Sequence, residues 1–300
     1  MHKTSCALLI LILLSLLVPS LIVNAKPAEN VININSDGTL QPSNAPINRN
    51  GDIYTLTSNF SGSIAVHRSN IVIDGAYYSL NGDGAKRSAG VEVKNNITRI
   101  PSPDEIWNVT IKNLAIVNFD FSIDVNFGGN DTIYNDYVVN TMSDLQGGVY
   151  FWGSSCNNVT RCTISGEPAV YMHFVSSQNT ITQNNLVGGI DLRIGGGETV
   201  DSNYWSDYST RYPLASEIGS TGVYNTPYMY NASDYVGSIT DDHPLVNPIA
   251  LVGFPKAVPN DAATTAASLP EFPAWAILFV IFAVVLAATV WVRKSGSSAK

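Results

Sequence analysis

The sequence predicts an all-β protein: a single-stranded, right-handed parallel β-helix of about six coils, between an N-terminal signal and one C-terminal transmembrane helix. Three observations predict this fold. An apolar frame recurs six times, an alternating strand follows most of the frames, and helical periodicity is absent outside two apolar terminal segments. The rival fold, a β-sandwich, would show turn dipeptides every 8 to 12 residues or so.

The N-terminus has the three-part form of a secretory signal. Lys3 precedes an apolar run from Cys6 to Val23, and Val23-Asn24-Ala25 supplies a small-residue cleavage site. We therefore expect residues 1–25 to be removed. Because the run is long for a signal peptide, an uncleaved signal anchor is the alternative.

Residues 26–70 should form an N-terminal cap and the first strands, because an uncapped end of a stacked sheet invites pairing with other chains. The strand-like segments IYTLT and SIAVHRSNIVIDG lie in this region. The coils themselves are expected over residues 71–208.

The frame that repeats in the coils is an apolar residue, a polar or small residue three positions later, and a second apolar residue two positions after that. Its six copies are Ile73-Ala76-Tyr78, Ile111-Leu114-Ile116, Ile133-Asp136-Val138, Val159-Cys162-Ile164, Ile181-Asn184-Leu186 and Val200-Asn203-Trp205. Because side chains alternate along a strand, an offset of five places both apolar residues inside only if the chain bends between them. Asn tolerates the left-handed conformation, so we expect the bend at Asn184 and Asn203.

A second strand with alternating apolar residues lies between successive frames. Its inward sets would be Val91/Val93, Ile123/Val125/Phe127, Val149/Phe151, Val170/Met172/Phe174 and Ile190/Leu192/Ile194. This pattern places Phe127, Phe151, Phe174 and Ile194 in one inward row. Short strands in coils of about 22 residues are typical of a parallel β-helix, in which each coil buries its apolar face against its neighbours.

Several segments resemble the NosD-type right-handed β-helix proteins of archaeal cell surfaces. They are the opening stretch from Val31 to Gly75, the coils NVTIKNL and NTITQNNL, and the closing elements NYWSDY (203–208), NTPY (225–228) and DDHPL (241–245). The likeness covers about residues 30–250. Where family members carry a glycine- and aspartate-rich turn, this chain has Gly222-Val223-Tyr224, so the family's metal site at that turn is not expected.

The C-terminal region predicts an anchor. After a capping segment (209–255) and a stalk rich in Ala, Thr and Pro (256–273), residues 274–292 run for 19 residues without a charge. The basic tail, 293–300, should lie in the cytoplasm and the body outside the cell membrane. Pro270, Glu271 and Phe272 resemble an archaeal PEF-type sorting signal. The helix is therefore either retained or exchanged for a lipid anchor by a sortase-type enzyme.

The net charge, the cysteines and the glycosylation motifs bear on the possible binding partners and covalent modifications of the chain. Residues 26–273 carry 12 basic and 24 acidic residues, a net charge of −12 (12 − 24), which argues against nucleic acid. Cys156 and Cys162 are either a disulfide or free thiols. Six N-x-S/T sequons mark glycosylation candidates at Asn59, Asn96, Asn108, Asn130, Asn158 and Asn231.

The candidate site is the outward side of the second strand. One row would hold Asp124, Tyr150, Tyr171 and Asp191, and the next Asn126, Trp152, His173 and Arg193. Aromatic rings between charged groups are suited to binding a sugar polymer. No cofactor is expected, with calcium as the one ion that Asp191 would suit. His67, His173 and His243 are too far apart in the sequence to predict the copper site that gives the family its name.

Two functions follow as expectations. The first is a non-catalytic surface protein that coats, adheres or binds glycans. The second is a polysaccharide lyase or glycoside hydrolase in which Asp191 and Arg193 act on the substrate, as the resemblance to β-helix enzymes implies.

Overall fold

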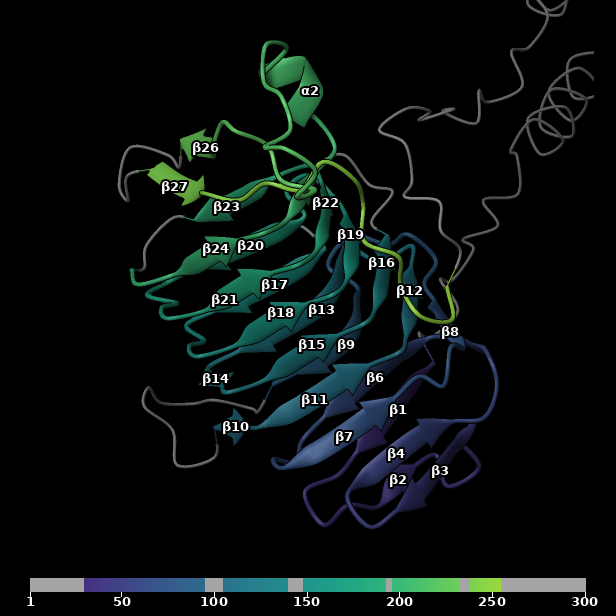
Figure 1. Cartoon of the computed structure of the whole chain (residues 1–300). Coiled ribbons are helices and arrows are strands. Elements are labelled where there is room, and N and C mark those ends of the chain that lie inside the picture. The colour runs from purple at the N-terminus through teal and green to yellow at the C-terminus, as the bar shows by residue number, and fades with distance from the viewer. Residues whose placement is uncertain (1–29, 95–104, 140–147, 193–195, 232–237, 255–300) are drawn as a thin grey trace, which may run out of the picture. The chain divides into compact units, whose positions relative to one another are not determined.

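The structure, a computed structural model, describes residues 30–94, 105–139, 148–192, 196–231 and 238–254 (Figure 1). The predicted signal, stalk, transmembrane helix, basic tail and sorting tripeptide lie outside these residues. Over the ranges that are described, no helix is long and apolar enough to cross a membrane.

Strands make up nearly all of the regular structure of the described residues, and most of them lie in three long sheets (Figure 1). The chain passes from one sheet to the next and pairs with itself one coil later, as in a parallel β-helix. Sheet A contains, in spatial order, β2 (Leu40–Gln41), β1 (Val31–Ile34), β6 (Ser63–Val66), β9 (Ala89–Val93), β13 (Phe121–Asn126), β17 (Val149–Trp152), β20 (Val170–His173) and β23 (Ile190–Leu192). Sheet B contains β24 (Thr199–Asp201), β21 (Thr180–Thr182), β18 (Asn158–Thr160), β15 (Thr132–Tyr134), β11 (Val109–Lys112), β7 (Ile71–Asp74), β4 (Ile53–Leu56) and β3 (Ile47–Asn50). Sheet C contains β25 (Tyr204–Trp205), β22 (Asn185–Val187), β19 (Thr163–Ser165), β16 (Tyr137–Val139), β12 (Ala115–Val117), β8 (Ser79–Asn81) and β5 (Phe60–Ser61).

The parallel pairing begins earlier in the chain than the predicted start of the coils at residue 71. β1, β4, β5 and β6 already lie in the three sheets, and β2 and β3 pair antiparallel at the ends of sheets A and B. Each sheet therefore has seven parallel strands within the described residues, against the six or so coils that were expected. The antiparallel strands β2 and β3 cover two of the exposed edges, which fits the predicted capping role.

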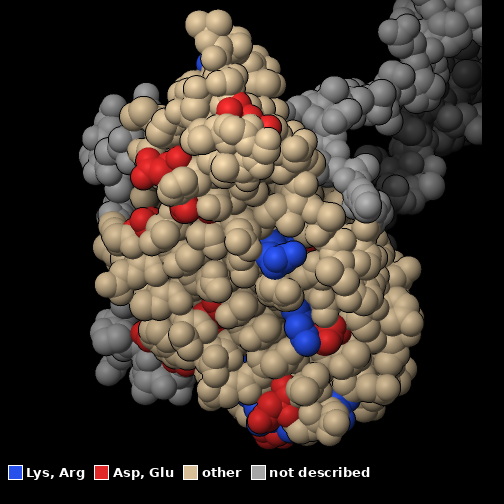
Figure 2. Space-filling view, in the orientation of Figure 1, with Lys and Arg blue, Asp and Glu red and all other residues tan. Residues whose placement is uncertain are grey.

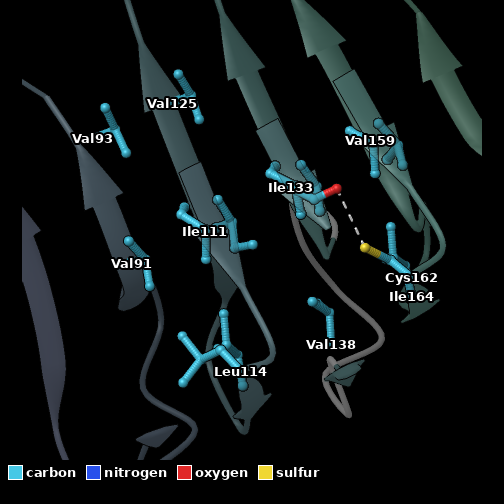
Figure 3. Packing of buried hydrophobic residues seen from close by; sticks show 14 of the residues in the cluster. Val91, Val93, Ile111, Leu114, Val125, Ile133, Val138, Val159, Cys162 and Ile164 are labelled. Atoms are coloured by element: carbon cyan, nitrogen blue, oxygen red, sulfur yellow. Dashed lines mark hydrogen bonds between the residues drawn. The ribbon is translucent and has the colours of Figure 1, made fainter. Parts of the chain in front are cut away.

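The apolar frame forms the core. Its first positions stand in register along sheet B and its last positions along sheet C, and both are buried (Figure 3). The bend between them is thus confirmed. The first copy is the exception: Leu80, not Tyr78, stands opposite Ile116, and Tyr78 is 37% exposed. An extra two residues in this turn move Tyr78 out of the core.

The left-handed residue at each bend is not the one that the sequence predicted. Gln183 (φ 55°) and Ser202 (φ 59°) adopt this conformation, while Asn184 and Asn203, one position later, have ordinary backbone angles. The prediction was wrong because the asparagine side chains point into the core, where they form hydrogen bonds with the neighbouring coil. Asn184 Nδ2 donates to Val159 O at 2.9 Å, and Asn203 Nδ2 donates to Ile181 O at 2.9 Å.

These inward side chains form a polar ladder along the core, in which each accepts a hydrogen bond from the backbone N–H of the coil before it. The acceptors, in order, are Asp136 Oδ1 from Leu114 (2.8 Å), Cys162 Sγ from Asp136 (3.4 Å), Asn184 Oδ1 from Cys162 (2.9 Å), Asn203 Oδ1 from Asn184 (3.0 Å) and Asp241 Oδ2 from Asn203 (2.8 Å). The ladder satisfies backbone donors at the bends, where strand pairing is interrupted.

The inward sets of the second strand are largely confirmed, with one error of register. Val125, Phe151, Met172 and Leu192 form one buried row of sheet A. Phe127 and Phe174 come after their strands end and adopt left-handed angles (φ 49° and 54°), which turn them outward. Phe127 is half-buried and Phe174 is 38% exposed.

The C-terminal cap contains a short helix, α2 (Tyr208–Arg211), and an antiparallel hairpin of β26 (Tyr228–Asn231) and β27 (Ser238–Asp241). Tyr228 stacks on the buried Trp205 at 3.9 Å, and Trp205 Nε1 donates to Asp241 Oδ2 at 2.9 Å. The conspicuous NYWSDY segment thus closes the apolar end of the coils.

Residues 244–254, which we call the strap, return along the side of the coils towards β8 (Figure 1). Two asparagines hold the strap backbone with both side-chain atoms: Asn185 binds Ile249 (2.9 and 2.7 Å), and Asn135 binds Val252 (3.1 and 3.0 Å). The Phe254 ring then contacts Tyr77 and Tyr137. The sequence did not predict this return.

Candidate functional site

The outward face of sheet A brings the predicted site residues together. Asp124 stands opposite Tyr150, Tyr150 opposite Tyr171, and Tyr171 opposite Asp191. In the next row Asn126, Trp152 and His173 are likewise in register. Both predicted rows are therefore confirmed as far as the structure describes them. Arg193 lies outside the described residues.

The two rows differ in how deeply their side chains are buried. Tyr150 and Tyr171 stack at 5.2 Å with nearly parallel rings, and Phe121 stacks on Tyr150 at 5.0 Å. Each tyrosine is only 7% exposed. The Tyr150 and Tyr171 rings are therefore largely inaccessible to a ligand.

The accessible rings gather where sheet A turns towards sheet B. Phe127, Trp152, His173 and Phe174 form this cluster, which we call the aromatic corner. Trp152 lies 4.6 Å from His173 and 5.4 Å from Phe174, whose ring is parallel to it within 7°. Phe127 meets Phe174 edge to face at 5.8 Å.

Gly153 makes the aromatic corner continuous across three coils. It has a left-handed φ of 60°, and a Cβ atom there would lie 2.8 Å from the Phe127 ring. Phe127 and Phe174 therefore meet across the coil of Gly153. The only sequence signal for this was a glycine at the column position that Phe127 and Phe174 share.

A polar group lies beside the aromatic rows on β9 and β13. Glu92 is in register with Asp124, Lys94 Nζ lies 2.9 Å from the Glu92 carboxylate, and Asn126 Nδ2 donates to Asp124 at 2.7 Å. Burial raises the pKa of Asp124 to about 7, against the hydrogen bond from Asn126, and the Glu92 charge adds to the rise. The sequence did not predict Glu92 and Lys94 as site residues.

The other end of the face holds Asp191, which is half-buried in β23. Burial and, to a lesser extent, the Asp191 carboxylate raise the pKa of Tyr230 in the C-terminal hairpin. Over the described parts of the chain, no three His, Cys, Asp or Glu side chains gather as metal ligands. His243 instead pairs with Asp201 at 2.8 Å, and His67 lies 3.4 Å from Asn33.

The sequons differ in exposure. Asn59, Asn108 and Asn130 are exposed, whereas Asn158 is half-buried and its Oδ1 is sealed from solvent with no hydrogen-bond donor. Asn96 lies outside the described residues, and Asn231 is the last residue of β26.

Charged side chains are sparse on the face shown in Figure 2, where uncharged atoms cover most of the surface.

Comparison with known proteins adds no relative: no family model, no curated protein and no solved structure matches the chain.

Proposed function

We propose that the chain is an exported cell-surface protein, anchored at its C-terminus, whose right-handed β-helix binds glycans through the aromatic corner without catalysis. The observation that carries the proposal is the contact of Trp152, His173 and Phe174 across two neighbouring coils, with Phe174 38% exposed. Aromatic faces of this kind stack on the apolar faces of sugar rings, and clusters of exposed aromatic side chains mark binding sites.

Glycan-array binding tests the proposal. The purified protein should bind a defined set of glycans, and Trp152→Ala and Phe174→Ala should each weaken binding at least several-fold. Tyr134→Ala is the matched control, because Tyr134 is a singly exposed aromatic residue on sheet B at 39% exposure. An array without a single bound glycan, or equal losses in all three variants, would refute glycan binding.

The anchor has its own test. The uncharged segment 274–292 and the basic tail motivate membrane attachment, and Pro270, Glu271 and Phe272 motivate sortase processing. Mass spectrometry of the mature C-terminus separates the two fates. A terminus at Lys300 supports a retained helix, whereas a terminus near Phe272 carrying a lipid supports the exchanged anchor.

A carbohydrate-cleaving activity is the second candidate, and one observation favours it. Glu92 and Asp124 are neighbours on adjacent strands, and burial raises the pKa of Asp124 to about 7. Carboxyl pairs of this kind act as acid and base in glycoside hydrolysis. Release of reducing ends from a bound glycan, abolished by Asp124→Asn, would support hydrolysis, and loss in Asp191→Ala and Arg193→Ala would support the lyase or hydrolase centre expected from the sequence.

A further inference from the structure

An exposed tryptophan lies at the same turn between sheets A and B, on the small sheet formed by β10 (Ile106–Trp107) and β14 (Gly128–Gly129). Trp107 is 40% exposed. Its ring lies over Gly129, where a Cβ atom would come within 2.9 Å of it. Figure 1 shows these two strands at the edge of the stack. Exposed tryptophans are costly to leave uncovered, because the indole has a large apolar face.

Two exposed sequon asparagines follow directly after the two residues of this contact. Asn108 follows Trp107 directly, and Asn130 follows Gly129. The Asn108 backbone N–H donates to Gly129 O at 3.0 Å, so the two coils are joined at this point. Both asparagines have left-handed angles (φ 61° and 54°).

The asparagine amides keep hydrogen atoms available for modification. Asn108 Nδ2 donates to Asn70 Oδ1 at 3.0 Å, and Asn130 Nδ2 reaches Asn108 Oδ1 at 3.5 Å. A primary amide has two N–H groups, so each of these contacts uses only one of them. The sequon threonines, Thr110 and Thr132, stand in register on the outer side of sheet B and are half-buried.

We propose that one asparagine of the Asn108–Asn130 pair carries an N-linked glycan, and that the first sugars of this glycan cover the Trp107 ring. The inference rests on the proposed function, because the modification requires export. In the linkage step the C1–O bond of a pyrophosphate-linked sugar donor breaks, Nδ2 bonds to C1, and Nδ2 loses one proton to solvent as the pyrophosphate leaves. The second N–H of the asparagine remains to keep the contact with the neighbouring coil.

Asn59 and Asn158, the other sequon asparagines whose side chains the structure describes, lack this combination. Asn158 is half-buried with a sealed Oδ1, so we expect it to carry no sugar. Asn59 is exposed, but its Oδ1 accepts from the Ser79 N–H at 3.0 Å and its neighbour Phe60 is half-buried against the core. Asn59 therefore offers a sequon without an exposed tryptophan, which makes it the matched control.

The test combines glycopeptide mapping with hydroxyl-radical footprinting of the full chain isolated from its membrane. We expect sugar on the peptide containing Asn108 or Asn130. Oxidation of Trp107 should rise several-fold in an Asn108→Gln/Asn130→Gln double variant and stay unchanged in Asn59→Gln. The buried Trp205 reports folding, because its oxidation should stay low in every folded variant.

Enzymatic removal of the glycan from the folded wild-type protein gives a second reading that does not depend on how the variant folds. It should raise Trp107 oxidation as the double variant does. An unmodified Asn108–Asn130 pair overturns the inference, and so does a Trp107 oxidation rate that glycan removal leaves unchanged. Neither result bears on the aromatic corner, since array binding by the deglycosylated protein tests that site separately.

Discussion

The buried residues of the polar ladder differ in how many of their side-chain polar atoms form hydrogen bonds. Asn184 and Asn203 accept one backbone hydrogen bond and donate another, each to the carbonyl of the first frame residue one coil back. Asp136 occupies the same column and accepts from Leu114, but its Oδ2 is buried without a partner. Burial raises the pKa of Asp136 well above its ordinary value, so folding favours the protonated carboxyl.

Asp136→Asn should therefore stabilise the protein at pH 8. The amide supplies a donor towards the Ile111 carbonyl without the cost of holding a proton, and we expect a gain of about 1–3 kcal/mol in the free energy of unfolding. Urea denaturation at pH 4 and pH 8 measures this, and the gain should shrink at pH 4, where the carboxyl of the unfolded chain is already about half protonated. The reverse substitution, Asn184→Asp, is the matched control and should destabilise at pH 8. A lower stability of Asp136→Asn at pH 8 would contradict the argument.

The two cysteines of the coils behave differently because they point to opposite sides. Both are free: Cys156 is exposed and Cys162 is buried, where burial raises its thiol pKa well above the ordinary value. Iodoacetamide at pH 8 should modify Cys156 within minutes and leave Cys162 untouched until denaturant is added. Peptide mass spectrometry would show this, and a disulfide-linked peptide would disprove it.

At the scale of the elements, the position of the strap is set by side chains of the coils rather than by a pattern in the strap's own sequence. Two asparagines, Asn135 and Asn185, supply four of its hydrogen bonds. Because these bonds are made to backbone atoms, the strap residues themselves need no special pattern, which explains why no sequence pattern predicted the strap.

Asn135→Ala or Asn185→Ala should release the strap locally. Each removes two hydrogen bonds to the strap and one to a neighbouring coil, at Asn113 Oδ1 or Thr163 Oγ1. We expect a local loss at the strap of about 1–2 kcal/mol. Hydrogen exchange of residues 244–254 should become faster, while exchange in β11 and β15 stays slow. Asn81→Ala is the control, since Asn81 Nδ2 bonds only to the neighbouring Ser79 Oγ. Unchanged exchange in the strap would show that ring contacts at Phe254 hold it instead.

Across the whole molecule, buried carboxyl groups set the pH dependence of stability. Burial raises the pKa values of Asp131 and Glu198 to about 7, as it does for Asp124, and it also raises that of Asp241. These groups bind a proton in the folded state at pH values where the unfolded chain has lost it. Their contribution is therefore complete below about pH 4 and is lost as the pH rises to about 7.

The free energy of unfolding should accordingly fall between pH 4 and pH 7. Asp131 alone contributes up to about 4 kcal/mol to this fall, because each unit of pKa shift corresponds to about 1.4 kcal/mol. The His243–Asp201 pair raises the pKa of His243 above its ordinary value of 6.5, so its contribution is present up to that pH and is lost as the pH rises further. Below pH 4 stability should fall again as Asp74 and Asp37, whose pKa values are lowered, become protonated. Urea midpoints from pH 3 to pH 8 test this, and a midpoint that rises from pH 5 to pH 7 would contradict it.

Prediction of the candidate site from the sequence was partial, for a physical reason. Alternation along a strand correctly placed Asp124, Tyr150 and Trp152 on the outward face, because side-chain direction in a strand is a local property. It could not foresee that Tyr150 is 7% exposed. Burial of an outward ring depends on neighbours from other coils, which no single strand encodes.

The sequence by itself determined that the chain is built from stacked parallel strands, because the frame from Ile73 to Trp205 has an offset that only a repeated bend satisfies. It also determined the rows of the core, apart from the first turn and the positions of Phe127 and Phe174. The tertiary structure alone decided the left-handed positions, the outward turn of Phe127 and Phe174, and the course of the strap. These features arise from contacts between residues one or more coils apart, where close packing and hydrogen bonding across coils override the local pattern.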